Sequence, residues 1–189
     1  MAVKFKHSNE YPMHFLTCTC YQWLNLIGMT NSYDCIYKWF RYLKAKRIDV
    51  IGYVIMPNHF HVILYFQQAE FDLNKVVGNG KRFIAYEIIK RLQEFDNLKM
   101  LDILKASITK REMDKGQKHR VFEESFDAKP IITDSFLKQK LDYIHFNPVR
   151  GKWNLVNDYT NYEHSSASFY ETGLAKLFEP IHYRSVGVD

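Results

Sequence analysis

The sequence predicts an α+β fold in which an antiparallel sheet is covered by helices. Its segments follow the order strand, helix, strand, strand, helix, and a two-residue turn joins two of the strands. The spacing of apolar residues also alternates between the period of two of a strand and the period of a helix. This order is typical of an α+β sandwich with its helices on one face of the sheet. We expect a single domain over 1–189, with 171–189 as a C-terminal tail.

The first part of the chain supplies three strands and one helix. Residues 12–20 alternate as a strand does, and 33–47 carry apolar residues at helical spacing before a basic last turn. Residues 49–56 and 59–66 are apolar and β-branched, and the Pro-Asn pair between them favours a tight turn. These two segments are therefore predicted to form a hairpin.

The second part of the chain is mainly helical. Residues 71–93 predict a basic helix interrupted by two glycines, 95–107 continue helically, and 108–120 read as a charged loop. A last helix is predicted over 133–147, because Thr and Asp residues suit its N-cap and a proline follows its end.

The composition indicates a globular protein. Hydrophobic residues make up 47% of the 189 residues and aromatic residues 16%, and no apolar run approaches the length needed to cross a membrane. The N-terminus lacks the apolar core of a signal peptide. The cysteines therefore predict reduced thiols in a cytoplasmic protein; they are Cys18, Cys20 and Cys35. A metal site at Cys18 and Cys20 is the alternative, but a strand-like run favours small buried side chains.

The positive charge is unevenly distributed. The chain carries a formal net charge of +5, and residues 71–120 hold 12 Lys and Arg against 7 Asp and Glu. Residues 121–189 are net acidic, with 7 against 10. This asymmetry suits a polyanionic partner, and the basic residues of 75–91 are expected to face it beside a metal site at the histidines described next. A solvated helix surface is the alternative.

Two histidines stand one residue apart within an apolar run. His59 and His61 belong to the predicted strand 59–66, in which alternate side chains point to one face. Two neutral imidazoles on one face can bind a divalent cation, and among Val, Ile and Leu they need a partner. The alternative is two histidines on the polar face of an amphipathic strand.

The last predicted helix carries a tyrosine and an asparagine one turn apart. Tyr143 and Asn147 lie on a stripe beside the apolar one, whereas His145 lies on the other side and is predicted to be structural. A phenolate at this spacing can act as a nucleophile while the amide oxygen binds a metal. The alternative is a tyrosine that packs and an asparagine that ends the helix.

Five segments, taken in order and spacing, resemble a known family. The His-Phe-His unit, with residues 52–58 before it, resembles the HUH motif of the single-tyrosine transposases. Residues 143–150 resemble the nucleophile helix of one branch, the REP-associated tyrosine transposases. Residues 77–83 resemble the start of that family's basic helix. Residues 121–127 resemble its acidic-aromatic turn, and 162–167 resemble its closing Ser-Ser-Ala signature. The resemblance spans about residues 7 to 170.

The chain departs from the family in three places. His164 stands where the family often has Trp before Ser-Ser-Ala, and the stretch 151–156 is longer than usual. Residues 94–120 are also long and charged. These departures leave the catalytic positions unchanged and concern the recognition of DNA.

The resemblance implies a ferredoxin-like or RRM-like sheet with the catalytic tyrosine, Tyr143, on a C-terminal helix. It implies cleavage and rejoining of single-stranded DNA at or near hairpins through a 5′-phosphotyrosine. An open site suits Mg²⁺ or Mn²⁺ better than structural zinc, with the ligands His59, His61 and Asn147. Candidate phosphate contacts are Lys81, Arg82 and Arg150. The expected partner is single-stranded or hairpin DNA, bound by a monomer or a homodimer in the cytoplasm, with no membrane.

Two other classes of function remain open. One is a non-catalytic DNA- or RNA-binding protein on the same fold, and the other is a metal-dependent phosphoesterase that uses water. A trapped covalent protein–DNA adduct separates the three, because only the transposase forms one.

Overall fold

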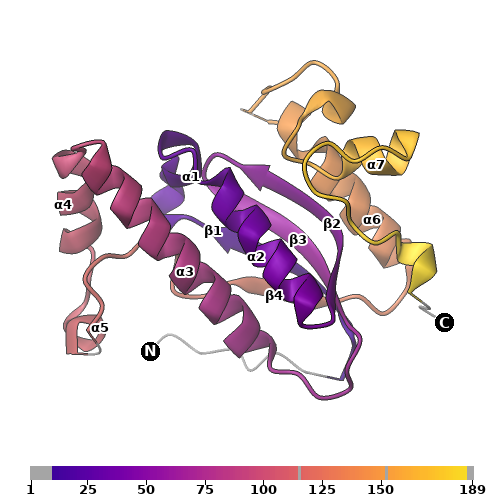
Figure 1. Ribbon diagram of the computed structural model, residues 1–189, viewed down its shortest axis with the longest axis horizontal. Coiled ribbons are helices and arrows are strands. Elements are labelled where there is room, and N and C mark those ends of the chain that lie inside the picture. Colours follow the sequence, from indigo (N-terminus) through magenta and orange to yellow (C-terminus); the bar gives the residue numbers. More distant parts are fainter. Residues whose placement is uncertain (1–9, 115, 152, 187–189) are drawn as a thin grey trace.

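An antiparallel sheet lies at the centre of the protein, whose computed structural model describes residues 10–114, 116–151 and 153–186 (Figure 1). Within these residues the sheet has four strands in the order β2-β3-β1-β4. The strands are β1 (Met13–Thr19), β2 (Ile48–Met56), β3 (His59–Phe66) and β4 (Asp127–Pro130). The longer helices are α2 (Tyr33–Ala45), α3 (Leu73–Glu94), α4 (Leu98–Ala106) and α6 (Asp134–Phe146). The shorter ones are α1 (Leu26–Met29), α5 (Lys110–Asp114) and α7 (Ala167–Thr172).

The topology is ferredoxin-like. The chain runs through two strand–helix–strand units, β1-α2-β2 and β3-α3-β4, and β1 and β3 lie side by side in the middle of the sheet. All pairs of neighbouring strands are antiparallel. This arrangement confirms the predicted α+β class.

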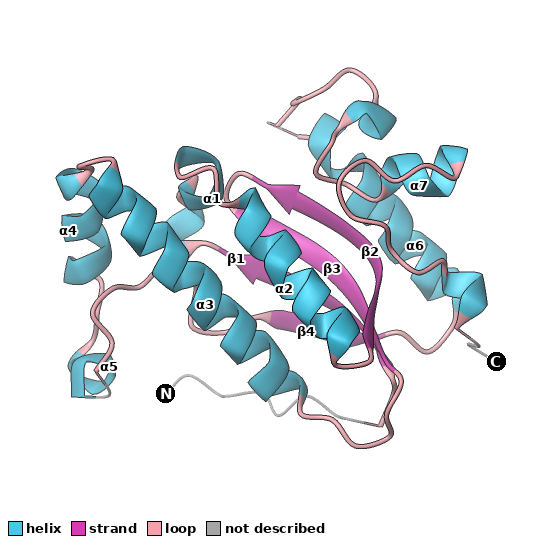
Figure 2. Ribbon diagram, in the orientation of Figure 1, coloured by secondary structure: helices cyan, strands magenta, loops and turns pink. Residues whose placement is uncertain are grey.

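Helices cover both faces of the sheet, rather than the one face expected (Figure 2). On one face α2 and α3 pack against the strands and form the α3-side core. On the other face α6 packs against the strands and forms the α6-side core. Every residue of β2 is therefore buried, which explains why that strand is an almost continuous apolar run.

Two glycines allow helices to approach their neighbours closely. A Cβ at Gly52 in β2 would lie 2.6 Å from Cδ2 of Leu141 in α6, so glycine lets this helix lie against the strand. A Cβ at Gly80 in α3 would lie 2.5 Å from Cε2 of Trp39 in α2. The predicted interruption of α3 is absent: the helix is continuous through both glycines, and at Gly80 it packs against α2.

Other elements differ from the predictions in detail. The strand β4 was not predicted, because Asp-Ala-Lys-Pro has a low strand propensity and is held by its pairing with β1. The helical stretch after α3 is a separate helix, α4, and the predicted loop over 108–120 contains the short α5. No helix among the described residues is both long and apolar enough to span a membrane.

Candidate metal and nucleophile site

The two histidines of β3 point to the same face of the sheet, as predicted. His59 and His61 are both buried, and their ring centroids lie 4.8 Å apart. They share the face that carries Phe15 and the α6-side core, while Phe60 between them points into the α3-side core. The period of two in the strand thus brings both imidazoles beneath α6.

Neighbouring side chains fix the orientation of both rings. Asn58 is fully buried; its amide donates to the carbonyl of Trp23 (3.0 Å), so its oxygen faces Nδ1 of His59 at 2.6 Å. Because an amide oxygen accepts, Nδ1 of His59 carries the proton and the lone pair lies on Nε2. Nδ1 of His61 lies 2.9 Å from the hydroxyl of Thr17 on β1. These two supporting residues were not among the predicted site residues, although Thr17 lies in the alternating strand.

His61 has the chemistry of a neutral metal ligand. Its Nε2 atom is buried and has no hydrogen-bond partner among the residues that the structure describes. Burial lowers the pKa of His61 well below its usual value, and His59 and Lys140 lower it further. A neutral imidazole with an unengaged nitrogen suits a divalent cation. No cluster of three or more His, Cys, Asp or Glu side chains that could hold a metal ion occurs in the described part of the chain. A third protein ligand would therefore come from another residue type.

The tyrosine of α6 lies beside this pair. The ring centroid of Tyr143 is 5.1 Å from that of His61 and 6.0 Å from that of Phe15. The side chain of Tyr143 is nevertheless 44% exposed, so its phenol is accessible to a substrate. The structure therefore brings together, within one chain, the histidine pair and the tyrosine that the sequence singled out.

A lysine adds positive charge next to the tyrosine. The Nζ atom of Lys140, one turn before Tyr143, lies 5.6 Å from the centroid of its ring. The same atom lies 4.9 Å from the ring centroid of Phe15 and 5.0 Å from that of Phe136. Burial and the charge of Lys129 lower the pKa of Lys140. This ammonium was not predicted, although its place on the Tyr143 stripe was a usable signal.

Asn147 lies at the end of α6, one turn after Tyr143. It is half-buried and caps the helix, and a short 3-10 turn, Asn147–Val149, begins there. Its role as a third metal ligand remains a prediction. His145 is structural, as predicted: it is buried, and its Nε2 lies 3.0 Å from the hydroxyl of Ser166. Ser166 also accepts from the backbone N–H of Tyr53 in β2, which ties α6 to the sheet.

The basic helix α3 covers the face of the sheet opposite the histidines. The prediction that this helix lies beside the metal site is therefore wrong. Nζ of Lys81 donates to the carbonyl of Glu123 at 2.7 Å, and burial lowers the pKa of Lys81, which argues against a phosphate contact. Arg82 is exposed and lines a groove between α3 and residues 117–126. Arg150 is exposed near the end of α6, with its guanidinium 4.7 Å from the Phe146 ring centroid.

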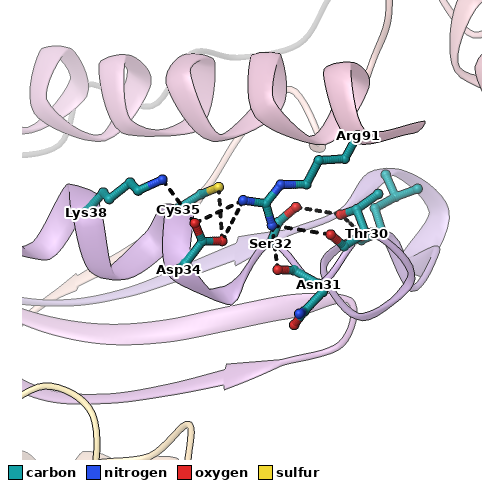
Figure 3. Close-up of polar contacts among 8 residues, drawn as sticks. Thr30, Asn31, Ser32, Asp34, Cys35, Lys38 and Arg91 are labelled. Atoms are coloured by element: carbon teal, nitrogen blue, oxygen red, sulfur yellow. Dashed lines mark hydrogen bonds and ion pairs between the residues drawn. The ribbon is translucent and has the colours of Figure 1, made fainter. Parts of the chain in front are cut away.

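Another basic residue of α3 is tied to the turn before α2 (Figure 3). Arg91 pairs with the Asp34 carboxylate at 2.8 Å and donates to the carbonyl of Asn31 at 2.5 Å. Its guanidinium therefore joins two helices, and only part of the charge of α3 is available to a partner.

The three cysteines lie in the α3-side core. Cys18, Cys20 and Cys35 are all buried free thiols. Burial raises the pKa of Cys18 and of Cys20 to about 12, so both thiols are protonated at neutral pH.

No protein-family model matches the sequence, and no curated protein is similar to it. A solved structure of a REP-associated tyrosine transposase bound to a REP hairpin is similar to this one, with a TM-score of 0.61. The similarity covers 92% of this chain and 88% of that chain at 18% sequence identity, a level that concerns the fold. The chain therefore has the fold of a REP-associated tyrosine transposase.

Proposed function

We propose that this protein cleaves and rejoins single-stranded DNA at or near hairpins, with Tyr143 as the nucleophile. The observation that carries the proposal is the contact of the Tyr143 ring with His61, 5.1 Å between centroids, beside a second buried imidazole. The fold supports it, because the similar solved structure is a tyrosine transposase bound to a hairpin.

The proposed reaction is a transesterification. The phenol oxygen of Tyr143 attacks phosphorus and gives up its proton to solvent; the bond from phosphorus to the 3′ oxygen breaks, and that oxygen takes up a proton. The products are a 5′-phosphotyrosine and a free 3′-OH. Because the phosphodiester bond is exchanged rather than hydrolysed, a second 3′-OH can attack the phosphotyrosine and rejoin the strands.

We further propose that His59, His61 and Asn147 would hold Mg²⁺ or Mn²⁺. The support is the donor set: His61 is neutral with a buried, unengaged Nε2, and Asn58 leaves the lone pair of His59 on its Nε2. When bound, such an ion neutralises the charge of the phosphate and makes phosphorus more reactive. Lys140 adds a fixed positive charge next to the tyrosine.

The exposed tyrosine favours this reaction over the two alternatives. A phosphoesterase that uses water needs no phenol beside its ligands, and a non-catalytic binding protein needs no unengaged imidazole nitrogen. One chain holds both the histidine pair and Tyr143, so a single copy carries the groups for the first step.

The test is a covalent adduct on denaturing gels. Hairpins with single-stranded flanks, labelled at the 3′ end, are incubated with the protein and Mn²⁺. We expect a labelled protein band, which Tyr143→Phe abolishes while its fold and DNA affinity are retained. Tyr86→Phe is the matched control, because Tyr86 is an exposed tyrosine of α3 on the other face of the sheet. Strand cleavage without an adduct would support the water mechanism, and an adduct that persists in Tyr143→Phe would exclude Tyr143 as the nucleophile.

A further inference from the structure

Trp23 presents a large apolar surface beside the histidine pair. Its side chain is 55% exposed, and its ring lies edge-on to that of His59, with 5.4 Å between the centroids. A second indole, Trp153, lies 6.3 Å from the same imidazole, but it is partly buried against the α6-side core. Trp23 is therefore the indole whose surface is open to a substrate at this site.

The backbone that carries Trp23 is strained and held in place. Gln22 and Trp23 have φ angles of 49° and 59°, a left-handed conformation that is unfavourable for residues other than glycine. The N–H of Gln22 donates to the Glu123 carboxylate at 2.8 Å, and the N–H of Trp23 donates to the carbonyl of Cys20 at 3.0 Å. The indole is thus exposed on a fixed turn rather than on a loose loop.

One buried side chain links this turn to the site. The Asn58 amide group donates to the carbonyl of Trp23, and its oxygen accepts from Nδ1 of His59. The position of the indole relative to His59 is therefore set by the residue that also orients the imidazole.

We propose that Trp23 stacks on an unpaired nucleobase of the nucleotide next to the scissile phosphate. The inference rests on the proposed function, because a phosphate held at the histidines places the neighbouring base within reach of this ring. A base has an apolar π-face whatever its identity, so one indole serves any sequence. A preorganised ring also loses little conformational entropy when it binds. The indole would thus position the strand before Tyr143 attacks.

The test separates stacking from phosphate contacts and needs no cleavage. In the Tyr143→Phe background, anisotropy measures the affinity for a short fluorescent oligo(dT) and for an abasic strand with the same phosphates. We expect Trp23→Ala to weaken oligo(dT) binding roughly tenfold and to leave binding of the abasic strand unchanged. Trp23→Phe, which keeps an aromatic face, should retain most of the affinity, and Trp23→Leu should not.

Tyr86→Ala is the control for the loss of an exposed aromatic ring, because Tyr86 is 63% exposed on α3. Tyr86→Ala should change neither the affinity for oligo(dT) nor the affinity for the abasic strand. Equal weakening of both strands by Trp23→Ala, or no weakening of oligo(dT), would overturn the proposal. Adduct formation is measured separately, with the protein that retains Tyr143. If Trp23 stacks on bases but no adduct forms, the proposed cleavage by Tyr143 is wrong and base stacking by Trp23 is supported. If an adduct forms but Trp23 does not stack, the proposed cleavage is supported and the role of Trp23 is wrong.

Discussion

The two nitrogens of the His61 ring have different surroundings, and this difference defines the site at the scale of single residues. Nδ1 lies against the hydroxyl of Thr17, whereas Nε2 is buried and has no hydrogen-bond partner in the described part of the chain. A buried polar atom left in this state is unfavourable unless a ligand engages it. Asn58 contacts Nδ1 of His59, just as Thr17 contacts Nδ1 of His61. Both rings are therefore oriented before any ligand binds.

Removing Asn58 should weaken metal binding. Asn58→Ala deletes the acceptor of His59 Nδ1, so the ring loses its fixed tautomer and orientation. We expect the Mn²⁺ concentration for half-maximal adduct formation to rise by about 10- to 100-fold. Asn58→Asp keeps an acceptor at this position and should need much less additional Mn²⁺. An unchanged Mn²⁺ requirement in Asn58→Ala would show that the amide does not support a metal ligand.

Lys140 should contribute its charge to DNA binding at the site. Its ammonium lies over the Tyr143 ring, where it can meet the phosphate that Tyr143 is proposed to attack. Lys140→Gln should lower the affinity for single-stranded DNA and reduce the slope of log affinity against log salt by about one, while Lys140→Arg preserves both. Lys138→Gln, an exposed lysine of the same helix, serves as the control and should have a smaller effect. A salt slope that Lys140→Gln leaves unchanged would mean that the ammonium only packs on the rings.

At the scale of elements, the proposed function depends on how closely α6 lies against the sheet. The apolar stripe of this helix packs into the α6-side core, where Leu137 and Leu141 are buried. Gly52 gives Leu141 the space to approach β2, and the bond of His145 to Ser166 ties the same helix to that strand. The distance between Tyr143 and the histidines is therefore set by residues outside the site.

A side chain at position 52 should move Tyr143, the proposed nucleophile. Gly52→Val must displace Leu141, because even a Cβ would lie 2.6 Å from it, so α6 shifts outward. We expect a loss of stability of about 1–3 kcal/mol and a larger loss of adduct formation than of DNA affinity. Gly78→Ala is the matched control: a Cβ there meets no atom within 4 Å, so helix propensity should stabilise the protein by about 0.5–1 kcal/mol. Adduct formation at the normal rate in a folded Gly52→Val protein would contradict this account.

At the scale of the whole molecule, the two faces of the sheet have different roles. The face toward α2 and α3 is an apolar core, and the face toward α6 carries the histidines. Burial keeps two imidazoles of the α6 side neutral: it lowers the pKa of His61 well below its usual value and that of His145 to about 4. Folding and the candidate site thus share a dependence on pH.

The protein should become less stable as the pH falls below about 6.5. There the unfolded chain takes up protons on His61 and His145 while the folded chain does not, so the free energy of unfolding decreases. For His145 the decrease is about 2 kcal/mol between about pH 7.5 and pH 5. Urea denaturation in EDTA measures it, and His145→Gln, which can still bond Ser166, should show a correspondingly smaller change. The same pH dependence in both proteins would contradict the assignment to His145.

The sequence by itself determined the elements that follow from local periodicity. Alternation in 59–66 placed both histidines on one face, and helical spacing placed Tyr143 and Asn147 on one stripe, because both patterns depend on backbone geometry alone. Tertiary structure alone decided that α6, and not α3, covers the histidine face. It also decided that Thr17 and Trp23 lie beside the histidines, and that Lys81 and Arg91 are held internally. These relations depend on contacts between residues far apart in the chain, and no spacing along the sequence encodes which surfaces meet.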